Sequence, residues 1–407
     1  MHFLHRRESG HPWVSVIALT FSIFIVNTSE FVPIGILPDI AESFSLTSGE
    51  AGQMITIYAW LVVCLSLPLT ALTMKVERRK LLLGLFLLFI LFQSVGAWSP
   101  SFPALILSRT GAAFVHSLFF SLAIPLVVSM APEGKRTKAL SYAASGTALA
   151  SVLGMPAGTL IGHYWGWHSV FGAIAGLALV NLLVLARSLP AMAGDDSRIA
   201  SSMKKMERNR SLLMVYAILF LGVSGYYTFY SYVVDFLQNG AMISRGWVPF
   251  ILMLAGIGGV CSSLLFPALY RCSPRYCLYA DIIVLTGVLF LMDIPFSETA
   301  ALRIAGVCGL VMVFTVFQLI LQSRIFILAS GYADLANSLF SSVFNVGIGM
   351  GALAGGRLLN GGAYVDRLGF AGAFFAAAAL ASEWAVLRFA DRGNLQADLQ
   401  KKGEKDD

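Results

Sequence analysis

Charged side chains are scarce in this sequence. Only 12% of the 407 residues are Asp, Glu, Lys or Arg, whereas an ordinary soluble domain has about 25%. A fold in water must cover its surface with polar groups, so this shortage excludes a soluble globular protein. Hydrophobic residues make up 57% of the chain, and most of its surface must therefore face an apolar medium.

Cysteine is also scarce, and the usual signatures of catalytic metal sites are missing. The five cysteines form no CxxC pair, which argues against a zinc or redox site. The sequence has no HExxH motif, no segment rich in DxxD, and no loop large enough to hold a water-filled catalytic site. We therefore expect neither an enzyme nor a bound metal or cofactor.

Long apolar runs, such as 81–92 and 212–223, dominate the chain instead. A membrane-spanning helix needs about 20 mostly apolar residues, whereas a membrane barrel shows short segments of alternating polarity. The sequence thus predicts an all-α membrane protein with twelve transmembrane helices in two six-helix bundles. The predicted spans are 13–37, 48–73, 80–99, 102–130, 139–162, 168–189, 212–236, 246–270, 277–296, 300–323, 335–359 and 369–389.

The one long polar stretch inside the chain predicts the boundary between the two halves. We expect an N-terminal six-helix bundle over 1–190, a cytoplasmic linker over 191–211 and a C-terminal six-helix bundle over 212–390. A charged cytoplasmic tail follows over 391–407, and its composition predicts disorder.

Lys and Arg residues are distributed unevenly between the predicted loops. With a cytoplasmic N-terminus, 23 of the 28 basic residues fall on the cytoplasmic side and four outside, and Arg109 lies in a span. This agrees with the positive-inside rule and predicts that both termini are cytoplasmic. The net charge of +6 is thus a topology signal that favours contact with anionic lipid and does not indicate a nucleic-acid partner.

Three ionisable residues lie inside spans of the first half, where a charge is costly and usually functional. Glu30 and Arg109 are predicted at similar depth in spans 1 and 4, so an ion pair between them is sterically allowed. His116 lies on the same face as Arg109, about 10 Å deeper, and can titrate near neutral pH. We predict that Glu30, Arg109 and His116 couple transport to protons. The alternatives are an interfacial carboxylate for Glu30 and a neutral core histidine for His116.

Neutral polar residues mark the spans of the second half. Span 7 has four tyrosines within 226–232, span 10 has two glutamines at i, i+4, and span 11 has a polar stripe. Such groups suit an uncharged, hydroxylated ligand, although an interfacial aromatic belt and hydrogen bonds between helices explain them equally well. The residues predicted to bind substrate are Asn27, Tyr227, Tyr230, Gln318, Gln322, Ser341 and Asn345.

Glycines at helical spacing occur in the fifth span of each half. Gly154, Gly158 and Gly162 form one face of span 5, and 347–355 repeats the pattern in span 11. Small residues allow close contact between helices. Their matching positions indicate the internal repeat that is typical of secondary transporters.

Three motifs resemble those of the major facilitator superfamily and, within it, its twelve-span drug:proton antiporters. The loop 70–79 matches the first motif only at its basic end, the segment 105–111 matches at Arg109, and Gly154–Gly158 resembles the motif of proton-exchanging exporters. The blocks 27–33, 76–82 and 344–351 resemble bacterial sugar efflux transporters of the arabinose/isopropyl-thiogalactoside type, as do the shorter stretches 57–60 and 130–136.

This resemblance implies proton-coupled efflux, by antiport and alternating access, of sugars or sugar-like small molecules through a bacterial cytoplasmic (inner) membrane. Spans 1, 4, 7 and 10 would line the cavity. The expected partners are the substrate, protons and membrane lipid, with the proton gradient in place of a cofactor and a monomer as the working unit. A multidrug/proton antiporter with the same fold stays open as the alternative.

Overall fold

The computed structural model describes residues 12–132, 134–192, 209–272, 276–294, 299–329, 333–362 and 365–406. Over these ranges the chain is helical, and no β-strand occurs in them. Eleven of the described helices are long and apolar enough to cross a membrane, and Cys277–Met292 is a shorter apolar helix. The prediction of an all-α membrane protein with twelve transmembrane helices is confirmed. Most of the predicted linker, 193–208, lies outside the described residues.

The elements follow the predicted spans closely, although several spans consist of more than one element. In the first half they are α1 (Pro12–Gly35), α2 (Leu37–Ser43), α3 (Ser48–Ala51), α4 (Gln53–Thr73), α5 (Arg78–Ala97), α6 (Phe102–Met130), α7 (Arg136–Leu149), the π-helix η1 (Ala150–Gly154), α8 (Met155–Trp165) and α9 (Trp167–Ser188). In the second half they are α11 (Arg210–Tyr230), α12 (Val233–Asp235), η2 (Phe236–Gly240), η3 (Arg245–Trp247), α13 (Val248–Cys272), α14 (Cys277–Met292), α15 (Ala300–Leu328), α16 (Ala333–Asn360), η5 (Val365–Arg367) and α17 (Leu368–Asp406).

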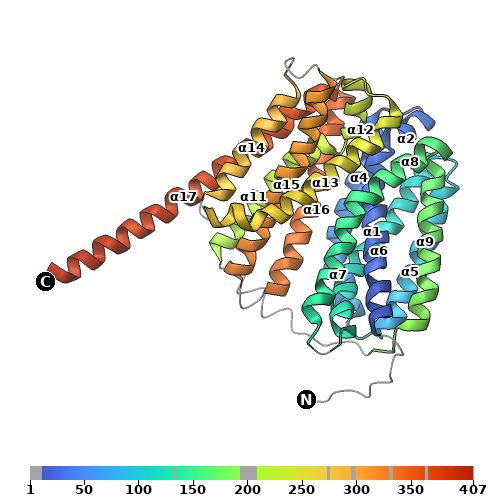
Figure 1. The fold of residues 1–407 in the computed structure, drawn as a ribbon, viewed down its shortest axis with the longest axis horizontal. Helices are drawn as coiled ribbons and strands as arrows, with labels where there is room; N and C mark the ends of the chain where they lie inside the picture. The colour runs from blue at the N-terminus through green and yellow to red at the C-terminus, as the bar shows by residue number, and fades with distance from the viewer. Residues whose placement is uncertain are drawn as a thin grey trace.

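The helices form two bundles that lie side by side (Figure 1). Within the first bundle α5 packs against α6 and α9, and α1 packs against α7; within the second, α11 packs against α16 and α17. The bundles meet where α4 contacts α16 and where α8 contacts α13. A cavity bounded by α1, α4 and α6 on one side and by α11 and α16 on the other is therefore formed by both halves.

The predicted glycine faces contact the first long helix of their own half. A Cβ atom at Gly158 would meet Val32 of α1, and one at Gly351 would meet the backbone of Ser224 and Thr228 in α11. In both halves, therefore, the fifth transmembrane helix packs closely against the first. The same crowding occurs at Gly154, Gly162, Gly347 and Gly355.

Span 5 is not a continuous α-helix, because its centre is the five-residue π-helix η1. Pro156 follows immediately in the first turn of α8, and proline has no N–H to donate to the preceding turn. A π-turn is a usual way to absorb such a break, and it often occurs at functional positions. The irregularity packs against α1, which is the helix that carries Glu30.

Polar contacts join the two halves at the end of the bundle where α2, α3 and α12 lie, at the top of Figure 1. Arg245 is 2.9 Å from a carboxylate oxygen of Glu42 and 3.4 Å from one of Asp39. Thr47 Oγ1 is 2.6 Å from Asn360 Oδ1 and donates to it. We call the three residues Arg245, Asp39 and Glu42 the Arg245 bridge. Burial raises the pKa of Asp39, although the nearby Arg245 opposes this shift.

The last helix is longer than the sequence suggested. α17 continues past the predicted end of span 12 to Asp406, and Figure 1 shows it projecting away from the bundle. The prediction of a disordered tail over 391–407 is therefore wrong for the backbone through Asp406. Ten of the sixteen residues in 391–406 are Lys, Leu, Gln, Arg, Ala or Glu, which have high helix propensity.

Candidate functional site

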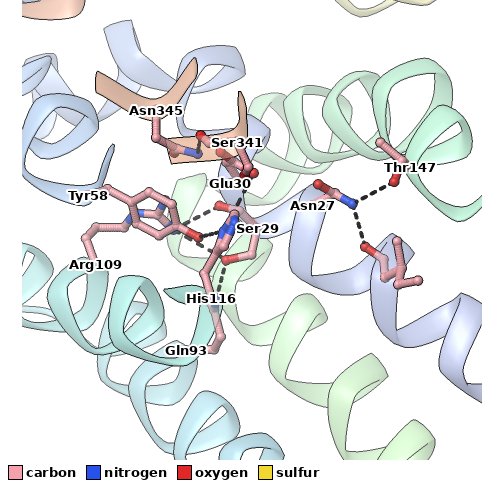
Figure 2. Close-up of polar contacts among 11 residues, drawn as sticks. Asn27, Ser29, Glu30, Tyr58, Gln93, Arg109, His116, Thr147, Ser341 and Asn345 are labelled. Atoms are coloured by element: carbon pink, nitrogen blue, oxygen red, sulfur yellow. Dashed lines mark hydrogen bonds and ion pairs between the residues drawn. The ribbon is translucent and has the colours of Figure 1, made fainter. Parts of the chain in front are cut away.

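A cluster of ionisable side chains from three helices lies beside the cavity. Glu30 extends from α1, and its Oε2 atom is 3.6 Å from Nδ1 of His116 on α6. Both side chains are largely buried, with exposed fractions of 12% and 7%. A carboxylate and a protonated imidazole at this distance form an ion pair, although the contact is longer than a hydrogen bond. The sequence allowed an ion pair of Glu30 with Arg109, whereas in the structure Glu30 lies beside His116 (Figure 2).

Tyr58 of α4 contacts two members of this cluster, although the sequence did not single it out as a site residue. Its hydroxyl lies 2.8 Å from His116 Nδ1. The Arg109 guanidinium lies over its ring, 4.3 Å from the ring centre, which is a favourable cation–π arrangement. Tyr58 therefore connects the charge of Arg109 to the titratable pair through one side chain.

Arg109 is buried and is oriented by α1, but not by an ion pair with Glu30. Its Nη1 donates to the backbone carbonyl of Ser29 at 2.9 Å, and Gln93 of α5 donates to the Ser29 hydroxyl. No carboxylate oxygen of the described residues comes within 4 Å of Arg109. The ion pair allowed by the sequence is thus not formed, because the carbonyl and the Tyr58 ring hold the guanidinium to one side.

The cavity beside this cluster is formed by both halves of the chain, and it is small, with a volume of about 10 Å³. The first half contributes the carboxylate of Glu30, the guanidinium of Arg109 and the ring of Tyr58. The second half contributes Tyr227 and Ile348. His116 does not line the cavity and lies behind Tyr58. The remaining lining residues are Phe31, Ile34, Ile55 and Ala59.

Stacked aromatic rings support Tyr227 from behind. Tyr226 is nearly parallel to Phe314 of α15, with ring centres 3.6 Å apart. Tyr227 meets the edges of Phe314 and Phe344, with centres about 6 Å away. We call Tyr226, Tyr227, Phe314 and Phe344 the aromatic wall. It faces the charged side of the cavity across the boundary between the halves.

The family model of the Major Facilitator Superfamily matches residues 19–351. The chain belongs to this superfamily. It is therefore a membrane transporter of small molecules and not an enzyme.

Solved structures of the same fold are similar over nearly the whole chain. A mutant form of the peptide transporter POT matches with a TM-score of 0.75 and 14% identity, covering 94% of this chain and 95% of that one. The same mutant in complex with alafosfalin matches with a TM-score of 0.74 and 13% identity, over 94% and 95% of the two chains. POT in complex with sulfate matches with a TM-score of 0.73 and 14% identity, over 93% and 94%. At this identity the likeness shows the fold alone.

Most of the predicted substrate-binding residues of this major facilitator protein do not reach the cavity. Tyr227 lines it. The Asn27 amide turns away from Glu30 and donates to Ile23 O and to Thr147 of α7 (Figure 2). The Tyr230 hydroxyl reaches the sulfur of Met155 in α8, 3.7 Å away, and so contacts the opposite half.

The polar residues of α15 and α16 contact their own half of the transporter. Gln322 donates to Asn337 at 3.3 Å, and Gln318 is half-buried. Asn345 is buried and donates to the backbone carbonyl of the exposed Ser341, while its own Oδ1 has no partner. Thus, of the residues proposed for span 11, Asn345 has a hydrogen-bonding group left unused. No group of His, Cys, Asp and Glu suited to hold a metal ion occurs in the described ranges.

Proposed function

We propose that this transporter exports sugars or sugar-like small molecules from the bacterial cytoplasm in exchange for protons. One observation carries the proposal: the titratable pair of Glu30 and His116 adjoins a cavity whose other side is Tyr227 of the aromatic wall, together with Ile348. Proton binding and substrate binding can therefore influence each other within one site. Because a single chain supplies both sides of the cavity, we propose that it works as a monomer.

Antiport needs two proton states that bind substrate differently. With Glu30 ionised and the cavity open to the cytoplasm, the carboxylate accepts hydrogen bonds from substrate hydroxyls. A proton arriving from the opposite side neutralises the pair, removes that acceptor and releases the substrate outward. The Arg245 bridge joins the halves at the predicted outer end, so the proposed cytoplasmic entry is at the opposite end.

The chemistry of the lining favours a hydroxylated substrate. Sugar C–H faces pack on aromatic rings, while hydroxyls bond to polar groups at the edge. Tyr227 supplies both a ring and a hydroxyl, and Glu30 and Arg109 supply an acceptor and a donor on the opposite side. We propose that Tyr230, Gln318, Gln322, Ser341 and Asn345 contact substrate when the halves separate, and that Asn27 acts through α7.

Export of organic cations is the second candidate, because the aromatic wall faces a buried carboxylate. Rings such as those of Tyr227 and Phe314 attract cations, and Glu30 would balance the charge of a bound cation. This would make the protein a multidrug/proton antiporter with the same coupling residues. The two candidates differ in whether the substrate carries a positive charge.

Transport in proteoliposomes tests the proposal. Inverted vesicles with an acid lumen and labelled arabinose outside should accumulate the sugar, and an uncoupler should abolish the accumulation. Glu50→Gln, which alters a carboxylate in the capping box of α3, serves as the control that should transport normally. Proton release driven by cationic dyes, with no response to arabinose or thiogalactosides, would select the multidrug function instead.

A further inference from the structure

The hydroxyl of Tyr58 and the carboxylate of Glu30 approach the same nitrogen. His116 Nδ1 lies 2.8 Å from the hydroxyl and 3.6 Å from the carboxylate oxygen. A ring nitrogen offers either one lone pair or one N–H, so it makes one good hydrogen bond at a time. The two neighbours must therefore compete for Nδ1, and the proton on the histidine decides between them.

We propose that Tyr58 relays proton binding at Glu30 and His116 to the substrate cavity by exchanging its hydrogen-bond partner. When Nδ1 carries no proton, the Tyr58 hydroxyl donates to it. When Nδ1 takes up a proton, its N–H turns to the Glu30 carboxylate, and Tyr58 turns its own hydrogen toward the cavity. No covalent bond of Tyr58 breaks, and the one proton gained stays on His116 or Glu30.

The position of Tyr58 explains why the relay would pass through this residue. Tyr58 lines the cavity, whereas His116 lies behind it and does not. A change at the histidine therefore reaches a bound substrate through the tyrosine hydroxyl. The Arg109 guanidinium over the ring keeps the Tyr58 ring in place, so Tyr58 itself has only to rotate its O–H bond, and the response needs side-chain movement but no movement of a helix.

Among the described residues, no titratable side chain other than those already named faces His116 and would bypass this exchange. In the described part of the chain, the charged or titratable groups facing His116 are Glu30 of α1, Tyr58 of α4 and Arg109 of its own helix. Arg109 stays protonated in proteins. Tyr227 of α11 faces Glu30 across the cavity, and the neighbouring ring on α6 is the apolar Phe120.

The relay rests on the proposed function, but it can be tested separately. Nitrogen NMR of histidine-labelled protein in lipid nanodiscs, assigned with His116→Gln, follows Nδ1 through a pH titration without substrate. Tyr58→Phe keeps the ring under Arg109 and removes the hydroxyl. Losing a hydrogen bond from the unprotonated form should move the midpoint of the titration to higher pH by about 0.4 to 1 unit.

A transport assay is the second measurement. Tyr58→Phe should lose proton-driven accumulation to a larger extent than it loses sugar counterflow without a gradient. Tyr216→Phe is the matched control, because it removes another buried hydroxyl, one that donates to Ala336 O in the second half. An unchanged titration in Tyr58→Phe, or full coupling in that variant, would overturn the relay. A wild-type protein that titrates as expected but moves no sugar would instead overturn the proposed function.

Discussion

The two sides of the cavity share one architecture but differ in chemistry. The side from the first half has a carboxylate, a guanidinium and a tyrosine hydroxyl, whereas the side from the second half has Tyr227 and Ile348 and no charged lining residue. Yet the same glycine contacts hold the fifth transmembrane helix against the first in both halves. The two halves therefore share their packing, while the side chains facing the cavity form a charged side and an uncharged side, which we propose to be the proton side and the substrate side.

Neutralising Glu30 should abolish the difference in charge between the two sides of the cavity. Of the changes considered, it should have the largest effect on transport. Glu30→Gln removes the titratable carboxylate at nearly constant volume, so substrate export should no longer draw on the membrane potential. A proton moving through 100 mV supplies about 2.3 kcal/mol, so the accumulation ratio should fall about fifty-fold per 100 mV. Sugar accumulation in proteoliposomes under an imposed potential measures this. Wild-type accumulation by the variant would remove Glu30 from the coupling mechanism.

The sequence singled out the charged residues of the first half because their signal is rare. Glu30, Arg109 and His116 stand out in apolar spans, where charges are costly, and Glu30 and His116 do meet. Tyr58 was not predicted as a site residue, because one tyrosine in an apolar helix has no distinguishing pattern. Its partners lie on other helices, and only the packing of α4 against α6 brings them together.

The substrate side was harder to predict because neutral polar residues have many possible partners. The amide of Asn27 is one turn from Glu30 in the sequence, yet it bonds to Thr147, because α7 packs beside α1. The expected pair of Arg109 and Glu30 failed for a similar reason. A free backbone oxygen at Ser29 captured the guanidinium, and helical periodicity contains no information about such an acceptor.

The shared packing can be broken in the second half alone. Gly351→Ala would place a Cβ atom against the backbone of Ser224 and Thr228, where little can yield. Overpacking of this kind typically costs about 1–3 kcal/mol, so the melting temperature in detergent should fall. Gly176→Ala, where nothing lies within 4 Å of the added atom, should melt like wild type. Equal melting of both variants would show that the glycine contact is loose.

A substitution in the aromatic wall should lower the affinity for substrate and leave proton coupling unchanged. Phe314→Leu removes the ring stacked on Tyr226 but keeps an apolar side chain. Aromatic pairs contribute about 0.5–1.5 kcal/mol beyond their buried area, so we expect sugar to bind about two- to tenfold more weakly. The number of protons exchanged per sugar should stay the same. Reduced coupling at unchanged affinity would contradict the division between the two sides of the cavity.

Substitutions in the Arg245 bridge should have the smallest effect, because the bridge joins the two halves without touching the cavity. Exposed ion pairs contribute about 0.2–1 kcal/mol, so Glu42→Gln should open this end at most about fivefold more often. Asp39→Asn should increase the opening of this end less than Glu42→Gln does. Burial raises the pKa of Asp39, which means that the closed state binds a proton there more readily than an exposed carboxyl does, and protonation of Asp39 should not open the contact. Maleimide labelling of Ile348→Cys, added from the Arg245 side, measures the opening. Faster labelling of Asp39→Asn than of Glu42→Gln would show that the ionised Asp39 is what holds the halves together.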